Sequence, residues 1–442
     1  MEVCDGSGGL SRARVATIDN RVNISAEFIE IPCNHNSRET HWLLRLVPPS
    51  RTVAYPVAPL PTSRLTMLRI AQHLTLAALL MDPRLAHAQR VVRESANVWR
   101  TASPVTLTIE RRWCVDANTE GCDFKAITAA IAVRDSGVVL ADFAGPIRRF
   151  AADGHVVAML GRKGRGPGEY GFIVGLNQAA NGLFAWFDNT QMRVATIALD
   201  GTAGPVTPLM PPHTMNGMWI LGAELVVIDV PPSTTFGDTV LASYHTVPAS
   251  GTPRVLARVR TPSVFEPNTD MQRMAGPFAP RVVSDVGPTG DVAHSNGGRY
   301  TIDVFPAQGA PWTLNVDMPL RAITSAEHDS ARALVLKQFR VGNVASLPPL
   351  VRDIMSVAAN RSTFAPLSTM RVLRDGTLWI RPVALAGASV ARWDVFTRDG
   401  RRVGAASLPI SARVLDGARD WVLVSELGND DVPMVVRYRV AK

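Results

Sequence analysis

The segment from residue 161 to residue 171, GRKGRGPGEYG, contains the residue types that phosphate-binding loops use. Glycines let backbone amides approach an anion, and neighbouring cations neutralise its charge. A P-loop would place Lys and Ser or Thr where Pro167 and Gly168 stand. A dinucleotide-binding turn needs free amides at the start of a helix, whereas Pro167 lacks an amide hydrogen and Glu169 repels phosphate. We therefore predict a structural turn, which comprises Gly164, Gly166, Pro167, Gly168 and Glu169.

The sequence contains few residue patterns that are typical of metal binding or catalysis. The histidines after residue 88 are far apart and lack the H-E-x-x-H spacing of a metalloprotease; they are His155, His213, His245, His294 and His328. Isolated histidines are usually structural or at the surface, but several could converge on one point in the folded chain. Neither a G-x-S-x-G nucleophile motif nor a D-x-D-x-D-G calcium loop occurs. We predict no catalytic residue, no metal ligand and no cofactor.

Asp142 and Asp188 end two similar apolar segments, VLAD and AWFD. They could contact a metal or a ligand. Alternatively, their side chains accept hydrogen bonds from the backbone of the following turn, as aspartates after strands often do. We favour the second interpretation.

The cysteines and an apolar segment both indicate export. Residues 67–88 combine a basic start, an apolar stretch too short to span a bilayer and the small-residue ending Ala86-His87-Ala88. This pattern predicts a signal peptide cleaved between Ala88 and Gln89; a buried helix is the alternative. Residues 1–66 would then be a doubtful extension, disordered or not translated. The protein would be periplasmic or extracellular, without a transmembrane span.

Cys114 and Cys122 belong to the short segment WCVDANTEGC. In an exported protein, two such cysteines favour a disulfide that closes a small loop. A metal pair is the alternative, but the spacing is not C-x2-C and no histidine lies near.

The composition excludes a typical nucleic-acid-binding surface. The formal net charge is +8, but the arginines occur singly or in pairs and never in a run. Apolar residues make up 46% of the chain, which also contains 33 Gly and 32 Pro. This combination favours a sizeable core built from short elements.

A repeated pattern of short apolar strands and Gly turns follows residue 130. Asp-Gly, Asn-Gly and Ser-Gly mark the turns, as in tight hairpins. The units cover residues 136–161, 181–209, 221–259, 289–318, 375–409 and 416–440. The spacing of the first three, which open at Gly137, Gly182 and Gly222, is close to the roughly 40–45 residues of a four-stranded propeller blade.

These repeats predict an all-β fold, a six-bladed β-propeller. The sixth unit stops after its second strand, so an early segment, residues 98–113, is expected to pair with it and close the ring. An open sandwich is the alternative. Residues 324–359 read as a helical insertion between blades 4 and 5, opened by a capping box of Thr324 and Glu327.

Over about residues 95–442, the chain resembles the bacterial six-bladed β-propellers related to NHL repeats. The resemblance rests on the GPGE turn within residues 161–171, on LRDGTLW (373–379) and on WDVFTRDG (393–400). It implies a propeller architecture and no single activity.

The resulting functional prediction is an exported monomer without catalytic activity. It would bind an unidentified protein, small molecule or glycan on a propeller face, with no nucleic acid as partner. The alternative is a metal-dependent hydrolase or lyase of the lactonase type, with its site in the central channel.

Overall fold

The computed structural model describes the chain in segments. These are residues 25–30, 42–47, 90–95, 104–115, 119–134, 136–143, 145–209, 217–231, 239–248, 252–262, 278, 280–384, 388–428 and 431–441. The chain divides into two compact units, Met1–Ala88 and Gln89–Lys442. In the first unit, β1 (Ser25–Glu30) pairs with β2 (Trp42–Val47) in an antiparallel ribbon. The predicted signal peptide and its cleavage position at Ala88 and Gln89 lie outside the described residues.

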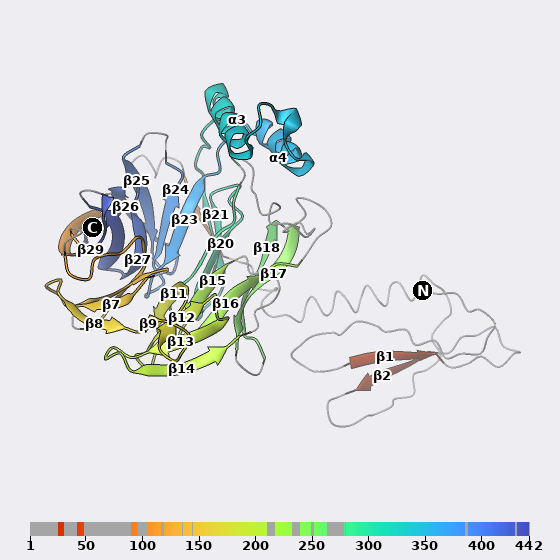
Figure 1. Ribbon diagram of the computed structural model, residues 1–442. Coiled ribbons are helices and arrows are strands. Elements are labelled where there is room, and N and C mark those ends of the chain that lie inside the picture. Colours follow the sequence, from red (N-terminus) through yellow and green to blue (C-terminus); the bar gives the residue numbers. More distant parts are fainter. Residues whose placement is uncertain are drawn as a thin grey trace, which may run out of the picture. The chain divides into compact units, whose positions relative to one another are not determined.

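The second unit is a six-bladed β-propeller, which confirms the predicted fold class (Figure 1). Blade 1 contains β5 (Ile127–Ala132), β6 (Val138–Asp142), β7 (Ile147–Phe150) and β8 (Val156–Leu160). Blade 2 contains β11 (Ile173–Gln178), β12 (Phe184–Asp188), β13 (Arg193–Ile197) and β14 (Ala203–Pro208). Between these blades, β9 (Arg162–Lys163) and β10 (Glu169–Tyr170) form a short parallel pair. Blade 3 contains β15 (Met218–Leu221), β16 (Glu224–Asp229), β17 (Thr239–Val247) and β18 (Val255–Pro262).

Blade 4 has a fifth strand at its outer edge. It contains β19 (Val283–Val286), β20 (Val292–Ser295), β21 (Thr301–Phe305) and β22 (Trp312–Val316), and β3 (Arg90–Glu94) pairs with β22 in parallel. Blade 5 contains β23 (Leu367–Val372), β24 (Leu378–Pro382), β25 (Val390–Phe396) and β26 (Arg402–Pro409).

Blade 6 closes the ring with strands from both ends of the propeller. It contains β27 (Arg413–Ala418), β28 (Trp421–Leu427), β29 (Pro433–Ala441) and β4 (Thr106–Trp113). β4 pairs antiparallel with β29, from Trp113 opposite Val435 to Thr106 opposite Ala441. This pairing confirms the predicted closing segment, and it protects the edge that β29 would otherwise expose.

Each blade begins one strand earlier than the sequence indicated. The predicted units start at Gly turns such as Gly137 and Gly376, but these glycines lie in the hairpin between the first and second strands of a blade. Gly376 has a positive φ of 80°, as tight hairpins require, and in the hairpin that contains Gly137 the positive φ of 64° belongs to Ser136. The innermost strands escaped detection because several, such as ITAAIA in β5, have small residues and no clear alternation.

The core lies between neighbouring blades, where the apolar faces of their sheets pack on one another. Trp186 lies in a cluster shared by blades 1 and 2, while Trp379 and Trp393 lie in one shared by blades 5 and 6. All three indoles are fully buried.

The predicted insertion between blades 4 and 5 contains α3 (Ser325–Phe339), a 3-10 turn η2 (Val344–Ser346) and α4 (Pro349–Ala359). Thr324 caps α3 and forms the expected capping box with Glu327. The helices project together from the propeller (Figure 1) and share a small apolar core that includes Leu347, Val351 and Met355. Among the described helices, none is long and apolar enough to cross a bilayer.

The ends of the insert are joined by a short stem. The Ile323 amide donates to the Ser362 carbonyl, and the Phe364 amide donates to the Arg321 carbonyl, both at 2.9 Å. Phe364 is therefore held at the base of the insert, three residues before β23 begins.

Candidate functional site

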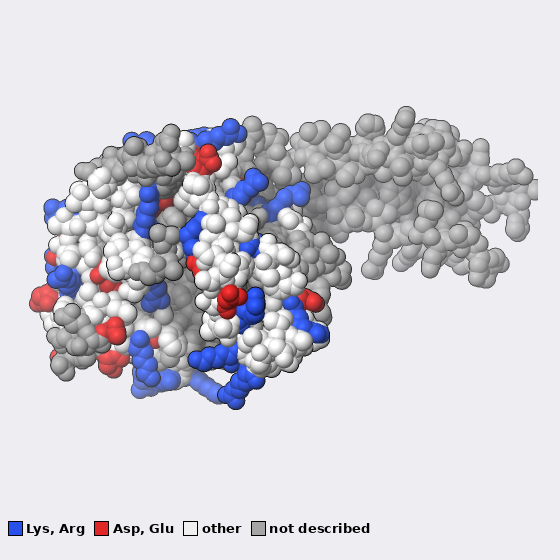
Figure 2. Space-filling model, turned by 90° about the horizontal axis from the view of Figure 1, so that it is seen from above, with Lys and Arg blue, Asp and Glu red and all other residues white. Residues whose placement is uncertain are grey.

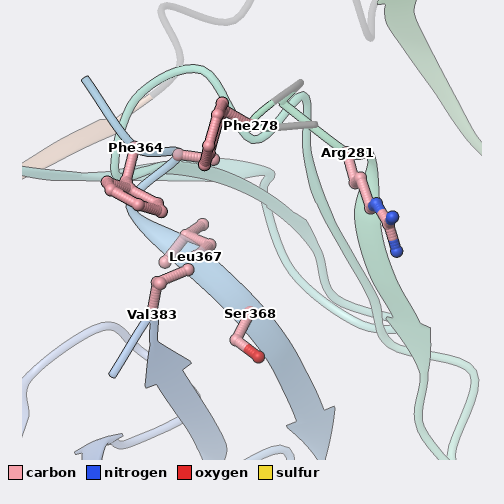
Figure 3. Close-up of a pocket in the computed structure, with 7 residues that line it drawn as sticks. Phe278, Arg281, Phe364, Leu367, Ser368 and Val383 are labelled. Carbon is pink, nitrogen blue, oxygen red and sulfur yellow. The ribbon is translucent and has the colours of Figure 1, made fainter. Parts of the chain in front are cut away.

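A cavity of about 260 Å³ lies beside the base of the insert, between blades 4 and 5 (Figure 3). Its lining comes from the segment before β19, from the end of the stem, from the first residues of β23 and from the residue after β24. The lining residues are Phe278, Arg281, Phe364, Ala365, Leu367, Ser368 and Val383. The cavity is thus shared by two blades and the insert, and a change at any of the three would alter it.

Two phenylalanines form the wall next to the insert. The rings of Phe278 and Phe364 meet edge to face with their centroids 5.1 Å apart. The His328 ring of α3 packs edge to face on Phe278 at the same centroid distance, and its Nε2 lies 3.0 Å from the Arg361 carbonyl. Such aromatic contacts stabilise a pair by about 0.5–1.5 kcal/mol, so the wall is coupled to the first helix of the insert.

Arg321, in the stem of the insert, packs against the phenylalanine wall. Its guanidinium lies 3.7 Å from the centroid of the Phe364 ring and donates to both carboxylate oxygens of Glu327, at 2.8 and 3.2 Å. Glu327 also accepts from the Thr324 amide at 2.9 Å. The hydrogen bonds from Arg321 and then from the Thr324 backbone lower the pKa of Glu327 to about 2. The carboxylate therefore stays ionised at the cap of α3 at any physiological pH.

The opposite side of the cavity is polar. Figure 3 shows Arg281 on the other side of the hollow from Phe278, Phe364, Leu367 and Val383, with its guanidinium directed away from them and the Ser368 hydroxyl below them. The exposed Arg281 side chain has no hydrogen bond or ion pair with any other described residue. A cavity that combines an apolar wall with a guanidinium that no other described residue pairs with can bury the apolar body of a small molecule and bind its anionic group.

Asp142 and Asp188 each accept hydrogen bonds from nearby protein groups, mainly backbone amides, and the two side chains form no common ligand or metal site. Asp142 accepts from the Lys125 and Ala126 amides, at 2.8 and 3.1 Å. Asp188 accepts from the Gly171 amide at 2.8 Å and from the Thr190 hydroxyl at 2.7 Å. Asp188 also accepts from the Thr190 amide at 3.1 Å, which agrees with the turn-capping interpretation, whereas these two hydrogen bonds of Asp142 come from the segment that precedes β5 and not from the following turn. Both aspartates link the second strand of their blade to the segment that enters the blade.

In the segment 161–171, several backbone amides that could bind phosphate donate to other groups of the protein. The Gly166 amide donates to the Glu169 carboxylate at 2.7 Å, and the Gly164 amide donates to the Tyr170 carbonyl at 3.0 Å. The Arg193 side chain donates to the carbonyls of Arg165, Gly166 and Glu169 at 2.8–3.0 Å. Gly168 has φ of 71°, a conformation that favours glycine. The segment connects β8, the outer strand of blade 1, to β11, the inner strand of blade 2.

The histidines of the described segments do not converge on one point. His155 lies in the turn before β8, His245 on β17, His294 on β20 and His328 on α3, while His213 lies outside the described residues. His294 is buried between the Tyr244 hydroxyl and the Asn296 side-chain oxygen, each 2.9 Å away. Across the described segments, no three His, Cys, Asp or Glu side chains are grouped as a metal ion would need.

Cys114 and Cys122 are joined by a disulfide. Both are buried in a cluster with Trp113 at the end of the closing strand β4 and with Phe124 before β5. The bond therefore lies where the chain passes from the last blade to the first.

Charged side chains form no single basic surface in the view of Figure 2. Lys and Arg are scattered there among uncharged residues, with fewer Asp and Glu between them. This distribution agrees with the sequence, in which cations never form a run.

The cavity itself was not found from the sequence. Two interruptions of the repeat contain or precede lining residues: Phe278 belongs to the Phe-containing segment 261–280, and Phe364 follows the insert 324–359. Phe278, Phe364 and Val383 are too distant in the sequence for any local pattern to bring them together. The unusual length of these interruptions was the one feature of the sequence that could have pointed to a functional site there.

Comparison with known proteins gives structural neighbours only. No protein-family profile matches the sequence, and no curated protein matches it. The resemblance to NHL-related propellers therefore stays a prediction. A Bacteroides fragilis protein assigned as exported is similar at 13% identity and a TM-score of 0.45, over 80% of this chain and 99% of its own. A member of the DUF4221 family from Bacteroides vulgatus is similar at 10% identity and a TM-score of 0.47, over 76% and 99%.

A gluconolactonase from Xanthomonas campestris is also similar, at 13% identity and a TM-score of 0.34, over 77% of this chain and 98% of its own. Virginiamycin B lyase from Staphylococcus aureus is similar at 11% identity and a TM-score of 0.32, over 76% and 88%. Likeness at these values assigns neither a ligand nor a reaction to the chain.

Proposed function

We propose that the chain is an exported propeller that binds a small amphiphilic carboxylate in the cavity beside the insert. The observation that carries this proposal is that Arg281, whose side chain pairs with no other described residue, lines the same cavity as an apolar wall that contains Phe278 and Phe364. A volume of about 260 Å³ suits a ligand of roughly ten non-hydrogen atoms, slightly below the usual drug-sized range.

The lining favours binding over turnover. Its described residues include no His, Asp, Glu or Cys, so no acid–base pair faces the cavity. Ser368 supplies a hydroxyl, but no base lies within hydrogen-bond distance of it among the described residues. The serine is better suited to donate a hydrogen bond to a carboxylate beside Arg281.

Export is supported by the disulfide and by the signal-like segment 67–88. N-terminal mass spectrometry of the protein made in a bacterial host with a periplasm tests this part. We expect the periplasmic form to begin at Gln89. Retention in the cytoplasm, or a terminus well upstream of Gln89, would contradict export through this segment.

Calorimetric titration with octanoate and with 3-phenylpropanoate tests the binding site. We expect at least one to bind, and the matching uncharged amide to bind at least tenfold more weakly, since hydrogen bonds to charged groups contribute about 1.5–3 kcal/mol. Arg281→Gln should weaken carboxylate binding by a similar factor. Ala365→Phe should abolish it by filling the cavity.

Arg299→Gln is the matched control, because Arg299 is an exposed arginine of blade 4 that does not line the cavity. It should bind the carboxylate as the native chain does. Failure of both acids to bind, or an equal loss in Arg299→Gln, would show that the cavity is not a carboxylate site.

A further inference from the structure

A second, larger cavity lies on the other face of the same two blades. In an antiparallel blade, the hairpin between strands one and two and the hairpin between strands three and four lie at the same face. The cavity of about 590 Å³ is lined by hairpins of this kind: residues 306–312 of blade 4, and residues 375–377 and 395–403 of blade 5. The insert joins β22 to β23 and therefore lies at the opposite face.

The lining of this cavity is rich in arginine. It includes Asp375 and Asp399, but also four arginines from separate elements: Arg90, Arg398, Arg401 and Arg419. Elsewhere in the sequence the arginines are scattered, so this concentration is produced by the fold rather than by a run of basic residues.

Two of the arginines are fixed in the walls. Arg398 pairs at 2.7 Å with Asp291, whose side chain is only 2% exposed. Asp291 also accepts from the Ala307 amide at 2.6 Å, which ties the blade 4 hairpin to blade 5. Arg90 donates to the Asp399 carbonyl at 2.6 Å. These contacts hold the two hairpins at a fixed separation.

The acidic side chains of the lining are engaged locally. Asp399 accepts from the Thr397 hydroxyl, and this bond, with the nearby charges of Arg401 and Arg90, lowers the pKa of Asp399. Asp375 accepts from the Thr377 amide at 3.0 Å. Both carboxylates thus shape turns.

Arg401 and Arg419 are different, since both are exposed and neither side chain has a hydrogen bond or an ion pair with another described residue. Two open guanidinium groups therefore remain in a rigid cavity, each able to bind an anionic oxygen group with two parallel hydrogen bonds.

We infer that this cavity is a second binding site, for a small ligand that carries carboxylate, sulfate or phosphate groups. Its volume lies within the range of about 300–1,000 Å³ that small-molecule sites occupy. The inference is independent of the proposed carboxylate site, because the two cavities share no lining residue.

The test uses the full chain and three probes that separate the sources of negative charge. They are trigalacturonate, a sulfated heparin-derived disaccharide and fructose 1,6-bisphosphate, each titrated by calorimetry. We expect at least one to bind, and to bind several-fold more weakly when salt rises from about 50 to about 200 mM. Arg401→Gln and Arg419→Gln should each weaken it about tenfold, since each removes hydrogen bonds to a charged group.

Arg165→Gln removes the same charge from an exposed position on the connection between blades 1 and 2, and it should leave binding unchanged. Arg281→Gln should also leave it unchanged, which separates this site from the first cavity. If none of the three probes binds, or if Arg165→Gln loses as much affinity as Arg419→Gln, the inference is wrong. Because Arg401 and Arg419 are exposed, thermal unfolding of their variants should match that of the native chain.

Discussion

Asp416 accepts a hydrogen bond from the Arg374 Nε at 2.7 Å, and this contact crosses from blade 6 to blade 5. The other carboxylate oxygen accepts from the Ala132 amide of blade 1 at 3.0 Å. One buried carboxylate therefore joins three consecutive blades beside the seam where the ring closes. Asp285 does the same for blades 3, 4 and 5, through Trp219, Arg371 and the Val372 amide.

We expect Asp416→Asn to destabilise the propeller. Asp416 is 6% exposed and Arg374 32% exposed, so the loss should be about 2–4 kcal/mol, somewhat less than for a fully buried pair. Chemical denaturation of the native chain and the variant measures it. Asp420→Asn changes an exposed aspartate in the turn of the same blade and should cost less than about 0.5 kcal/mol. Equal stability of Asp416→Asn and the native chain would show that the seam does not depend on this carboxylate.

The disulfide should stabilise the junction of β4 with blade 1. The entropy of closing a loop of this length corresponds to about 2–3 kcal/mol. A chain with both Cys114→Ser and Cys122→Ser should therefore melt at a lower temperature than the oxidised native chain. Adding a reductant should lower the melting temperature of the native chain and leave that of the double variant unchanged. If the reductant also lowers the melting temperature of the double variant, its effect on the native chain does not come from this disulfide.

Arg193 should control the order of the segment 161–171. Lys cannot reproduce its bonds to three carbonyls, because an ammonium lacks the planar geometry of a guanidinium. In Arg193→Lys, we expect faster amide hydrogen exchange in residues 161–171, with the other blades little changed. Arg162→Lys is the control, since the Arg162 side chain is 83% exposed and pairs only with Glu169 among the described residues. Similar exchange in both variants would rule out Arg193 as the anchor.

Stability should fall as the pH falls through the range in which His294 titrates. Burial lowers the pKa of His294 from its ordinary value of 6.5, so the unfolded chain binds this proton at a higher pH than the folded chain. Below about pH 6.5, the free energy of unfolding should therefore drop by up to about 1.4 kcal/mol per pH unit from this group. His294→Gln should retain partners in Tyr244 and Asn296 but show a shallower decline. If the free energy of unfolding falls with the same slope in the native chain and in His294→Gln between about pH 6.5 and 5, this histidine is not the cause of the decline.

Local features of the sequence were sufficient to predict most of the architecture. Repeated Gly turns marked the hairpins, Thr324 and Glu327 marked the start of α3, and an early segment supplied the closing strand. These features act through short-range effects, namely positive φ, helix capping and the alternation of side chains along a strand. The innermost strands were missed because their burial comes from neighbouring blades and not from their own pattern.

The two cavities were determined by the tertiary structure. Arg281 and Phe364 meet at one cavity, and Arg90 and Arg419 at the other, although hundreds of residues separate the second pair in the sequence. The sequence determined which hairpins and which insert exist. Ring closure determined which of their side chains face one another, because contacts between blades depend on how the sheets pack around the axis and not on any periodicity along the chain.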